Sequence, residues 1–335
     1  ELAGYGILLW GNMNGSYSEG AMGYNENAKS DLSWGVYTSR GWQQPNLVTY
    51  MESHDEERLV YKCLKYGKTE GNYSTGQPGT ALERVELSSL FFLPLPGPKM
   101  IWQFGELGYG YSINTCTNTS LTADSCRLTP KPVRWDYTGE ANRYKLYKVM
   151  GQLNYLKTNL EEFSGAASFT GSLSGEVKWY RLSYGNNHVA ALGNFATSAK
   201  SVTMSFPVTG TWYDYFYGST YTVTSTSQNI TLAPGEYLLL STRKLDDPFT
   251  GTSLVKMQPG NITLFPNPAT DRVIISCDQP LGRIEIRNLS GQMVYSGDFP
   301  EKNKAEIFLG KRVPGIYLVQ VMNDGKRISR KLLLY

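Results

Sequence analysis

The first 160 residues alternate between strand-like and helix-like patterns of apolar and polar positions. Short apolar runs that end in polar residues predict buried strands over residues 5–12, 46–53 and 99–106. Apolar residues at helical spacing predict helices over 81–93 and 141–160. The stretch 14–27 is predicted to be part of a long polar loop, which is either a binding loop or a surface excursion. Strands that alternate with helices indicate parallel βα units.

After about residue 163 the pattern changes to short strands separated by turn residues. Residues 164–245 contain several such strands and predict an antiparallel β-sandwich. Residues 246–261 are polar and contain Pro and Gly, which is typical of a linker. Alternating strands with tight turns return over 262–335 and predict a second, smaller β-sandwich.

Composition limits the classes of partner. The 335 residues carry 32 basic and 29 acidic side chains, a net charge of +3, which argues against a nucleic acid or a membrane surface held by bulk charge. Aromatic residues make up 13% of the chain, and their flat rings suit sandwich cores as well as sugar binding. The longest apolar stretch, "LSSLFFLPLPGPKMIW", is broken by prolines, so no transmembrane segment is predicted. The first residues read as the middle of a domain rather than as a signal peptide, and we expect the C-terminal part of a longer protein.

The four cysteines are Cys63, Cys116, Cys126 and Cys277. Their spacing matches no CxxC or Cys/His pattern, so no zinc site is predicted. Cys116 and Cys126 flank a polar loop and are either a disulfide or two free thiols. A disulfide there would suit an exported protein and would contribute roughly 2–3 kcal/mol through loop closure. The export signal described below favours the disulfide.

The stretch "YMESHDEERL" (50–59) places one of only two histidines in an acidic cluster directly after an apolar run. One reading is a solvated turn, in which residues 56–58 open the next helix. The stretch also resembles the fourth signature stretch of the α-amylase family, glycoside hydrolase family thirteen. In that family a His-Asp pair ends barrel strand seven, and His54 and Asp55 occupy those positions.

Further stretches carry the same resemblance in consistent order over residues 1–243. "PGPKMIWQFGELG" (96–108) resembles the family's strand-eight stretch, in which Glu106 matches a Glu, with the Gly one place off the commonest spacing. "KPVRWDY" resembles the approach to the last barrel helix, and the sandwich at 164–243 resembles the family's domain C. The resemblance implies a multidomain chain: strands six to eight of a (β/α)8 TIM barrel over 1–163, followed by two all-β sandwich domains.

The resemblance also implies roles for residues at the strand ends. Asp55 would grip sugar hydroxyls and stabilise the oxocarbenium-like transition state, and His54 would hydrogen-bond a sugar hydroxyl. Both positions belong at the C-terminal mouth of the barrel, where TIM-barrel active sites lie. Glu106 is predicted to contact substrate from strand eight.

Three further substrate-binding residues are predicted from position along the chain. Glu52 points either into the cleft or into an ion pair with Arg58. Trp10 and Asn12 close the presumed strand six and can contact sugar, although core packing is the alternative for Trp10.

The sequence departs from the commonest family pattern at Ser53, where most members carry Asn, and this leaves subsite specificity open. The family's nucleophile Asp and acid/base Glu end strands four and five, and no residue of this chain matches them. The chain alone is therefore expected to be inactive. No metal or cofactor is predicted in this part, although calcium remains possible in the full-length parent.

Residues 262–335 resemble the C-terminal sorting domain of the type IX secretion system. The resemblance rests on "LFPNPATD", "IEIRNLSGQMVYSG" and "VPGIYLVQVMNDGKRISRKLLLY", in that order. An adhesive or carbohydrate-binding sandwich is the alternative. The sorting domain implies export by the type IX machinery, with the protein secreted or held on the outer-membrane surface of a Gram-negative bacterium.

The combined expectation is a secreted α-amylase-like hydrolase of α-1,4-glucans, including starch, glycogen and maltooligosaccharides, that acts with retention. Two alternatives stay open. One is a glucan branching or transglycosylating enzyme on the same scaffold, which Ser53 allows. The other is a non-catalytic surface protein that binds glucan.

Overall fold

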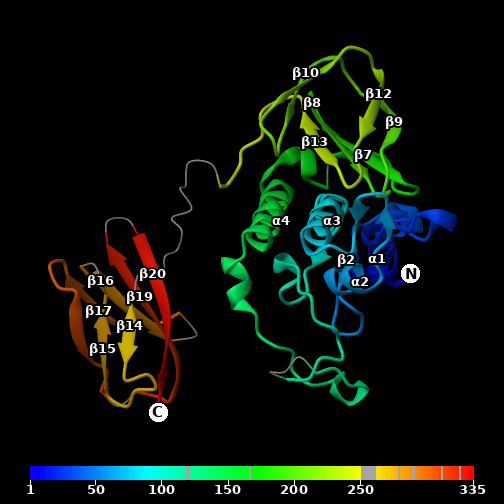
Figure 1. Cartoon of the computed structure of the whole chain (residues 1–335). Helices are drawn as coiled ribbons and strands as arrows, with labels where there is room; N and C mark the ends of the chain where they lie inside the picture. Colours follow the sequence, from blue (N-terminus) through cyan, green and yellow to red (C-terminus); the bar gives the residue numbers. More distant parts are fainter. Residues whose placement is uncertain are drawn as a thin grey trace. The chain divides into compact units, whose positions relative to one another are not determined.

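The computed structural model describes residues 1–117, 121–165, 167–249, 262–277, 280–288, 291–310, 312–323 and 326–335. The chain divides into two compact units, Glu1–Thr250 and Gly251–Tyr335 (Figure 1). Residues 250–261, which make up most of the predicted linker, lie outside the described residues. The predicted boundary between residues 163 and 164 falls inside the first unit and stays a prediction.

The first part of the larger unit is a parallel sheet with helices around it. Strands β1 (Leu9–Asn12), β2 (Leu47–Tyr50) and β5 (Lys99–Met100) pair in parallel in the order β1-β2-β5. The helices are α1 (Asn14–Met22), α2 (Leu59–Tyr66), α3 (Pro78–Leu90) and α4 (Ala141–Asn159). The parallel pairing agrees with the expected βα units, but β5 is much shorter than the strand predicted over 99–106.

Small elements connect these strands and helices. Strands β3 (Thr69–Glu70) and β4 (Tyr73–Ser74) form a short hairpin. The 3-10 helices are η1 (Leu2–Tyr5), η2 (Glu26–Ala28), η3 (Ser33–Gly35), η4 (Tyr37–Arg40), η5 (Gly105–Leu107), η6 (Asp124–Cys126), η7 (Trp135–Gly139) and η8 (Glu161–Phe163). Within the described residues, no helix has both the length and the apolar character needed to cross a membrane.

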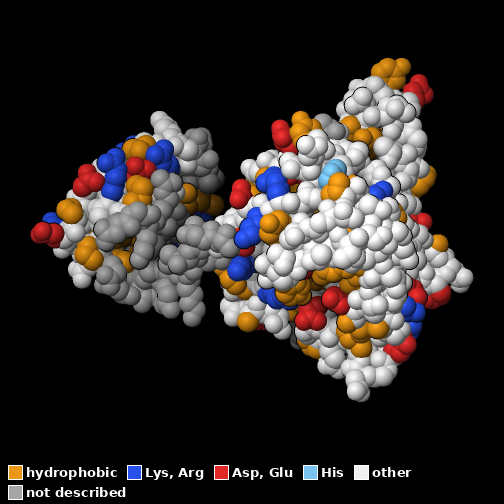
Figure 2. Space-filling view, turned by 90° about the horizontal axis from the view of Figure 1, so that it is seen from above, with side chains coloured by type: hydrophobic (Ala, Val, Ile, Leu, Met, Phe, Trp, Pro, Cys, Tyr) orange, Lys and Arg blue, Asp and Glu red, His pale blue; other side chains and the backbone are white. Residues whose placement is uncertain are grey.

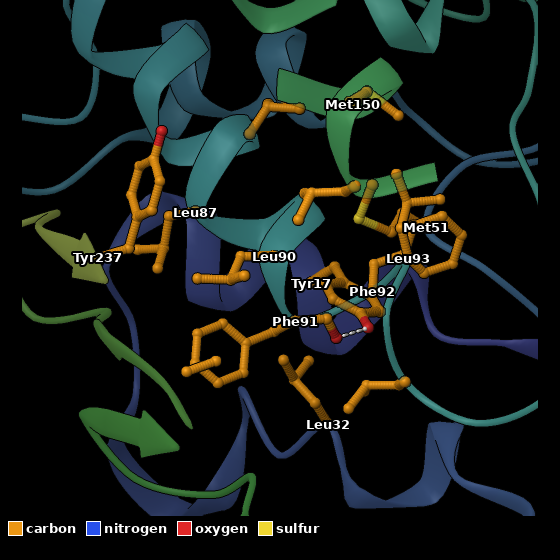
Figure 3. Packing of buried hydrophobic residues seen from close by; sticks show 14 of the residues in the cluster. Tyr17, Leu32, Met51, Leu87, Leu90, Phe91, Phe92, Leu93, Met150 and Tyr237 are labelled. Atoms are coloured by element: carbon orange, nitrogen blue, oxygen red, sulfur yellow. Dashed lines mark hydrogen bonds between the residues drawn. The ribbon is translucent and has the colours of Figure 1, made fainter. Parts of the chain in front are cut away.

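Helix α1 corrects the loop predicted over 14–27. Its sequence is polar and contains two glycines, so the periodicity of the chain gives little helical signal there. Packing supplies what the sequence lacks, because Tyr17 is fully buried and its hydroxyl donates a hydrogen bond of 2.6 Å to the Phe91 carbonyl (Figure 3). A side chain at Gly20 would meet the Phe195 ring, so a small residue permits this close approach. Tertiary contacts therefore stabilise this helix more than helix propensity does.

One hydrophobic core joins the helices to the sandwich that follows them (Figure 3). Phe91, just after α3, packs edge to face against Tyr180 and Phe195, with ring centroids 5.5 Å away in both cases. Leu87 and Leu90 of α3 are fully buried in the same cluster. The shared core explains why the parallel sheet and the sandwich form one compact unit.

The sandwich of the first unit consists of a six-stranded sheet and a two-stranded sheet, in the orders β11-β10-β13-β8-β7-β6 and β12-β9. Its strands are β6 (Ser168–Ser172), β7 (Val177–Tyr184), β8 (Asn187–Asn194), β9 (Lys200–Ser205), β10 (Gly210–Asp214), β11 (Thr220–Val223), β12 (Ser227–Leu232) and β13 (Tyr237–Ser241). Leu192, Phe206 and Trp212 are buried in a second cluster formed by these strands.

The second unit is a separate antiparallel sandwich with its own core. Its sheets have the orders β14-β15-β18 and β17-β16-β19-β20. The strands are β14 (Thr263–Phe265), β15 (Arg272–Ser276), β16 (Gly282–Asn288), β17 (Met293–Phe299), β18 (Lys304–Phe308), β19 (Gly315–Asn323) and β20 (Lys326–Leu334). Val273, Ile284 and Ile307 are buried between the sheets. The small β-sandwich predicted for the C-terminus is therefore confirmed.

Candidate functional site

The three parallel strands bring the predicted site residues to one edge of the sheet. Asn12 pairs with Tyr50, and Tyr50 pairs with Met100, so all three strands end at the same level. The segments that follow β2 and β5 carry His54, Asp55 and Glu106. Because the carboxyl ends of parallel strands meet at one edge, residues far apart in the sequence form a single cluster, here called the strand-end cluster.

His54 and Asp55 lie side by side and face solvent. The His54 Nε2 atom is 3.3 Å from the Asp55 carboxylate, and the two side chains are 69% and 64% exposed. The His54 ring also contacts Trp102, with centroids 5.5 Å apart. The Asp55 backbone is held at both ends, because its N–H donates to the Ser53 hydroxyl at 3.0 Å and its carbonyl accepts from Arg127 at 2.6 Å. The backbone is thus fixed while the carboxylate stays accessible.

Asn12 connects β1 to this cluster. Its amide donates a 2.5 Å hydrogen bond to the Glu56 carboxylate, which also accepts a hydrogen bond from the Ser53 hydroxyl. Trp10 is 65% exposed and packs edge to face against Tyr50, with centroids 6.0 Å apart. The Trp10 indole is therefore accessible in this chain, and both its predicted sugar contact and the core-packing alternative stay predictions.

Glu52 is held inside the protein. One carboxylate oxygen pairs with Arg58 at 2.9 Å, and the other accepts the Leu59 N–H at 2.7 Å, where α2 begins. Glu52 therefore forms the ion pair that was the alternative to a sugar contact. Both of its carboxylate oxygens already accept hydrogen bonds, and a sugar contact by Glu52 stays a prediction. Arg58 precedes α2 rather than opening it, and its guanidinium also lies 5.0 Å from the centre of the Tyr109 ring.

Glu106 lies in η5 and is half-buried. Burial raises the pKa of its carboxyl group, and the neighbouring Arg58 charge opposes that shift. A carboxyl group with a raised pKa at the strand ends is a reasonable substrate or proton partner. Its predicted contact with substrate stays a prediction.

A loop that sequence reasoning did not assign to the site borders the strand-end cluster. Residues 109–131 contribute Tyr111, Ser112, Arg127 and Lys131 to a depression that His54 and Trp102 also line. Cys116 and Cys126 are joined by a disulfide bond. The Lys131 ammonium donates to the carbonyl oxygens of residues 126 and 127 at 2.6 and 3.1 Å, which fixes the end of the loop.

Glu57 attaches the other end of this loop to the acidic segment. Its carboxylate accepts hydrogen bonds from the Ser112 hydroxyl at 2.6 Å and from the Ile113 N–H at 2.8 Å. The cysteine pair was the only sequence signal for this loop, and it indicates a closed loop without indicating where the loop packs. Sequence reasoning therefore missed Glu57 and Arg127 as residues that organise the site.

The cluster suits a neutral polyhydroxylated ligand. It offers an imidazole, an exposed carboxylate and the Trp102 indole, which together combine hydrogen-bonding groups with a flat apolar surface. Within the described residues, no group of three or more His, Cys, Asp or Glu side chains is placed to hold a metal ion.

Residues 263–335 match the family model of the secretion system C-terminal sorting domain. This domain marks proteins exported by type IX secretion to the cell surface or the extracellular space. The chain carries an export signal of this class. The predicted sorting domain and location are therefore confirmed. A search of curated proteins found no match to the sequence.

Among solved structures, the chain resembles enzymes of the α-amylase family. An Anoxybacillus α-amylase is 11% identical with a TM-score of 0.48, over 69% of this chain and 45% of that chain. An AmyP variant in complex with maltotriose is 16% identical with a TM-score of 0.48, over 69% and 49%. The γ-CGTase of alkalophilic Bacillus clarkii is 14% identical with a TM-score of 0.46, over 98% and 49%. The chain thus spans about half the length of these structures.

Proposed function

We propose that this chain is part of a secreted α-amylase-like glycoside hydrolase that cleaves α-1,4-glucans such as starch, glycogen and maltooligosaccharides with retention. The observation that carries the proposal is the exposed His54–Asp55 pair at the edge where three parallel strands end. In this proposal β1, β2 and β5 are strands six, seven and eight of a (β/α)8 barrel. The export domain agrees with a polysaccharide substrate outside the cell.

The chemistry assigns separate tasks to the two residues. Glycosidic cleavage passes through an oxocarbenium-like state, and a nearby carboxylate stabilises the positive charge that develops. Asp55 supplies that carboxylate, and its backbone is fixed by Ser53 and Arg127. His54 hydrogen-bonds a sugar hydroxyl, while the rings of Trp10 and Trp102 offer flat surfaces to the sugar.

The family resemblance assigns no nucleophile and no acid/base to this chain. We therefore expect the 335-residue chain to leave starch intact and the longer parent to supply the other two carboxylates. Any calcium of the parent is expected outside this part of the protein.

The test uses Asp55→Asn in the longer protein, with reducing ends released from soluble starch as the readout. Loss of transition-state charge stabilisation predicts a fall in turnover of at least two orders of magnitude, or ~3–4 kcal/mol. Glu83→Gln is the control, because Glu83 is an exposed carboxylate on α3 away from the strand ends. Turnover of the Asp55 variant within a few-fold of wild type would show that the role assigned to Asp55 is wrong.

A non-catalytic glucan-binding protein is the second candidate, and the exposed Trp10 ring and the His54–Trp102 contact favour it. Such a protein would bind maltooligosaccharides without releasing reducing ends, even with the parent's remaining segments present. If the longer protein instead converts maltooligosaccharides into longer or branched products, the transglycosylating alternative is supported.

A further inference from the structure

A second depression lies between α4 and the segment that follows β10. It is lined chiefly by Tyr144, Lys148 and Gln152 of α4, by Phe216 and Tyr217, and by Tyr237 of β13. We call it the α4 groove. It shares no lining residue with the depression beside His54, so it is a separate feature of the first unit.

The polar base of the α4 groove is built around a buried carboxylate. Glu86 of α3 is 1% exposed, and its Oε2 atom accepts hydrogen bonds from Lys145 at 2.9 Å and from the Tyr237 hydroxyl at 2.8 Å. In Figure 3 the Tyr237 hydroxyl points away from the other labelled core side chains. These bonds hold Lys145 and Tyr237 in place, so the groove is preformed, and Glu86 neutralises one of its two lysines.

Other side chains that line the α4 groove have aromatic faces or polar groups that can contact a ligand. Tyr217 is 69% exposed, and Tyr144 is half-buried and stacks on Tyr147 with ring centroids 6.1 Å apart. Gln152 is buried, yet its amide makes no hydrogen bond with any described residue. Lys148 has no ion-pair partner among the described residues, and its ammonium lies 5.7 Å from the centre of the Phe249 ring. The groove therefore combines exposed aromatic rings with an amide and an ammonium group that make no hydrogen bond to the described residues.

We propose that the α4 groove binds a short segment of a neutral sugar chain, away from the strand-end cluster. The Tyr144 and Tyr217 rings contact the apolar faces of sugar rings, while the Gln152 amide and the Lys148 ammonium bind hydroxyl groups. Because Glu86 neutralises Lys145, the groove lacks the concentrated positive charge that a polyanion needs. That the sugar is an α-glucan rests on the proposed function.

The experiment titrates the full 335-residue chain with maltoheptaose by isothermal calorimetry and follows tryptophan fluorescence in parallel. Tryptophan reports the strand-end cluster through Trp10 and Trp102, whereas no tryptophan lines the groove. We expect Tyr217→Ala and Gln152→Ala each to weaken the calorimetric binding at least fivefold. Tyr184→Ala, a partly exposed tyrosine on β7, is the matched control and should bind as wild type does.

The outcomes separate the groove from the proposed function. Unchanged maltoheptaose binding in both groove variants would overturn the groove proposal. Binding that depends on Tyr217, without any tryptophan response, would support the groove and contradict glucan binding at the strand ends. If the chain binds cellohexaose but not maltoheptaose, and this binding depends on Tyr217, the proposal of a sugar site in the α4 groove is supported. The proposed function on α-glucans is then wrong.

Discussion

Charged side chains occur in two contrasting regions of the first unit. At the contact between α3 and the sandwich, Arg84 and Lys178 are fully buried, whereas His54 and Asp55 at the strand ends face solvent. On the face shown in Figure 2, basic and acidic side chains are interspersed with apolar ones, as expected for a nearly neutral chain. Burial of a charge alone therefore does not identify the functional region.

The bonding of the buried groups explains the difference. Arg84 donates five hydrogen bonds, all to backbone carbonyls, which belong to residues 20, 21, 194, 195 and 196. Lys178 lies 3.0 Å from the Ser30 hydroxyl, a contact that resembles a catalytic serine–lysine pair. Both Lys178 and Ser30 are fully buried, so no substrate can reach them. These groups connect segments of the fold. The exposed His54 and Asp55 side chains, in contrast, can still form hydrogen bonds with a ligand.

Arg84 provides the most severe test of this contrast. Arg84→Met keeps an unbranched apolar stem but removes the guanidinium and leaves buried carbonyl groups of α1 and β8 without donors, so we expect a loss of about 3–5 kcal/mol in the free energy of unfolding. Urea unfolding of the full chain, followed by circular dichroism, measures the change. The control is Lys65→Met, an exposed lysine of α2, with an expected change within about 0.5 kcal/mol. If Arg84→Met lowers the free energy of unfolding no more than Lys65→Met does, the structural role proposed for Arg84 is wrong.

The same contrast shows what the sequence can predict. Periodicity found α3, α4 and the sandwich strands, because each buries a regular apolar face. It missed α1, which is polar in composition and depends on Tyr17 and Gly20 for packing. The strand ends could be located because parallel strands place the residues after them at one edge. The packing of residues 109–131 could not be predicted, because it depends on bonds such as Glu57 to Ser112 that no local pattern encodes.

Glu52 tests whether the strand-end cluster contains a structural residue. Glu52→Gln removes the charge that compensates the buried Arg58 guanidinium, although the amide oxygen can still accept the Leu59 N–H. We therefore expect a loss of about 2 kcal/mol in the free energy of unfolding, less than for complete removal of a buried partner. The measurement is the same urea titration at pH 7.

Glu106→Gln is the matched control for Glu52. Burial already raises the pKa of the Glu106 carboxyl group, so replacing it with a neutral amide is expected to change stability by less than about 1 kcal/mol. Equal losses of unfolding free energy in Glu52→Gln and Glu106→Gln would show that Glu52 has no special structural role. That result would favour the predicted contact of Glu52 with sugar.

An effect of similar size to that of Glu52→Gln is a pH dependence that originates at the buried contact. Burial lowers the pKa of Lys178 from 10.5 to about 7, with a small opposing effect of Asp31. Between about pH 7 and pH 10 the unfolded chain therefore binds more protons than the folded chain, so the contribution of Lys178 to stability rises with pH. For a single group this amounts to about 2 kcal/mol between pH 7 and pH 9.

Lys178→Met isolates that contribution, because other groups titrate in the same range. Burial also lowers the pKa of Lys157 to about 8, so the wild-type profile contains more than one rising component. The difference in unfolding free energy between wild type and Lys178→Met, measured at pH 7, 8 and 9, removes the shared component. We expect the unfolding free energy of wild type to increase relative to that of Lys178→Met as pH rises. A constant difference would mean that the Lys178 ammonium stays charged in the fold, and that the Ser30 and Gly175 oxygens solvate it as well as water does.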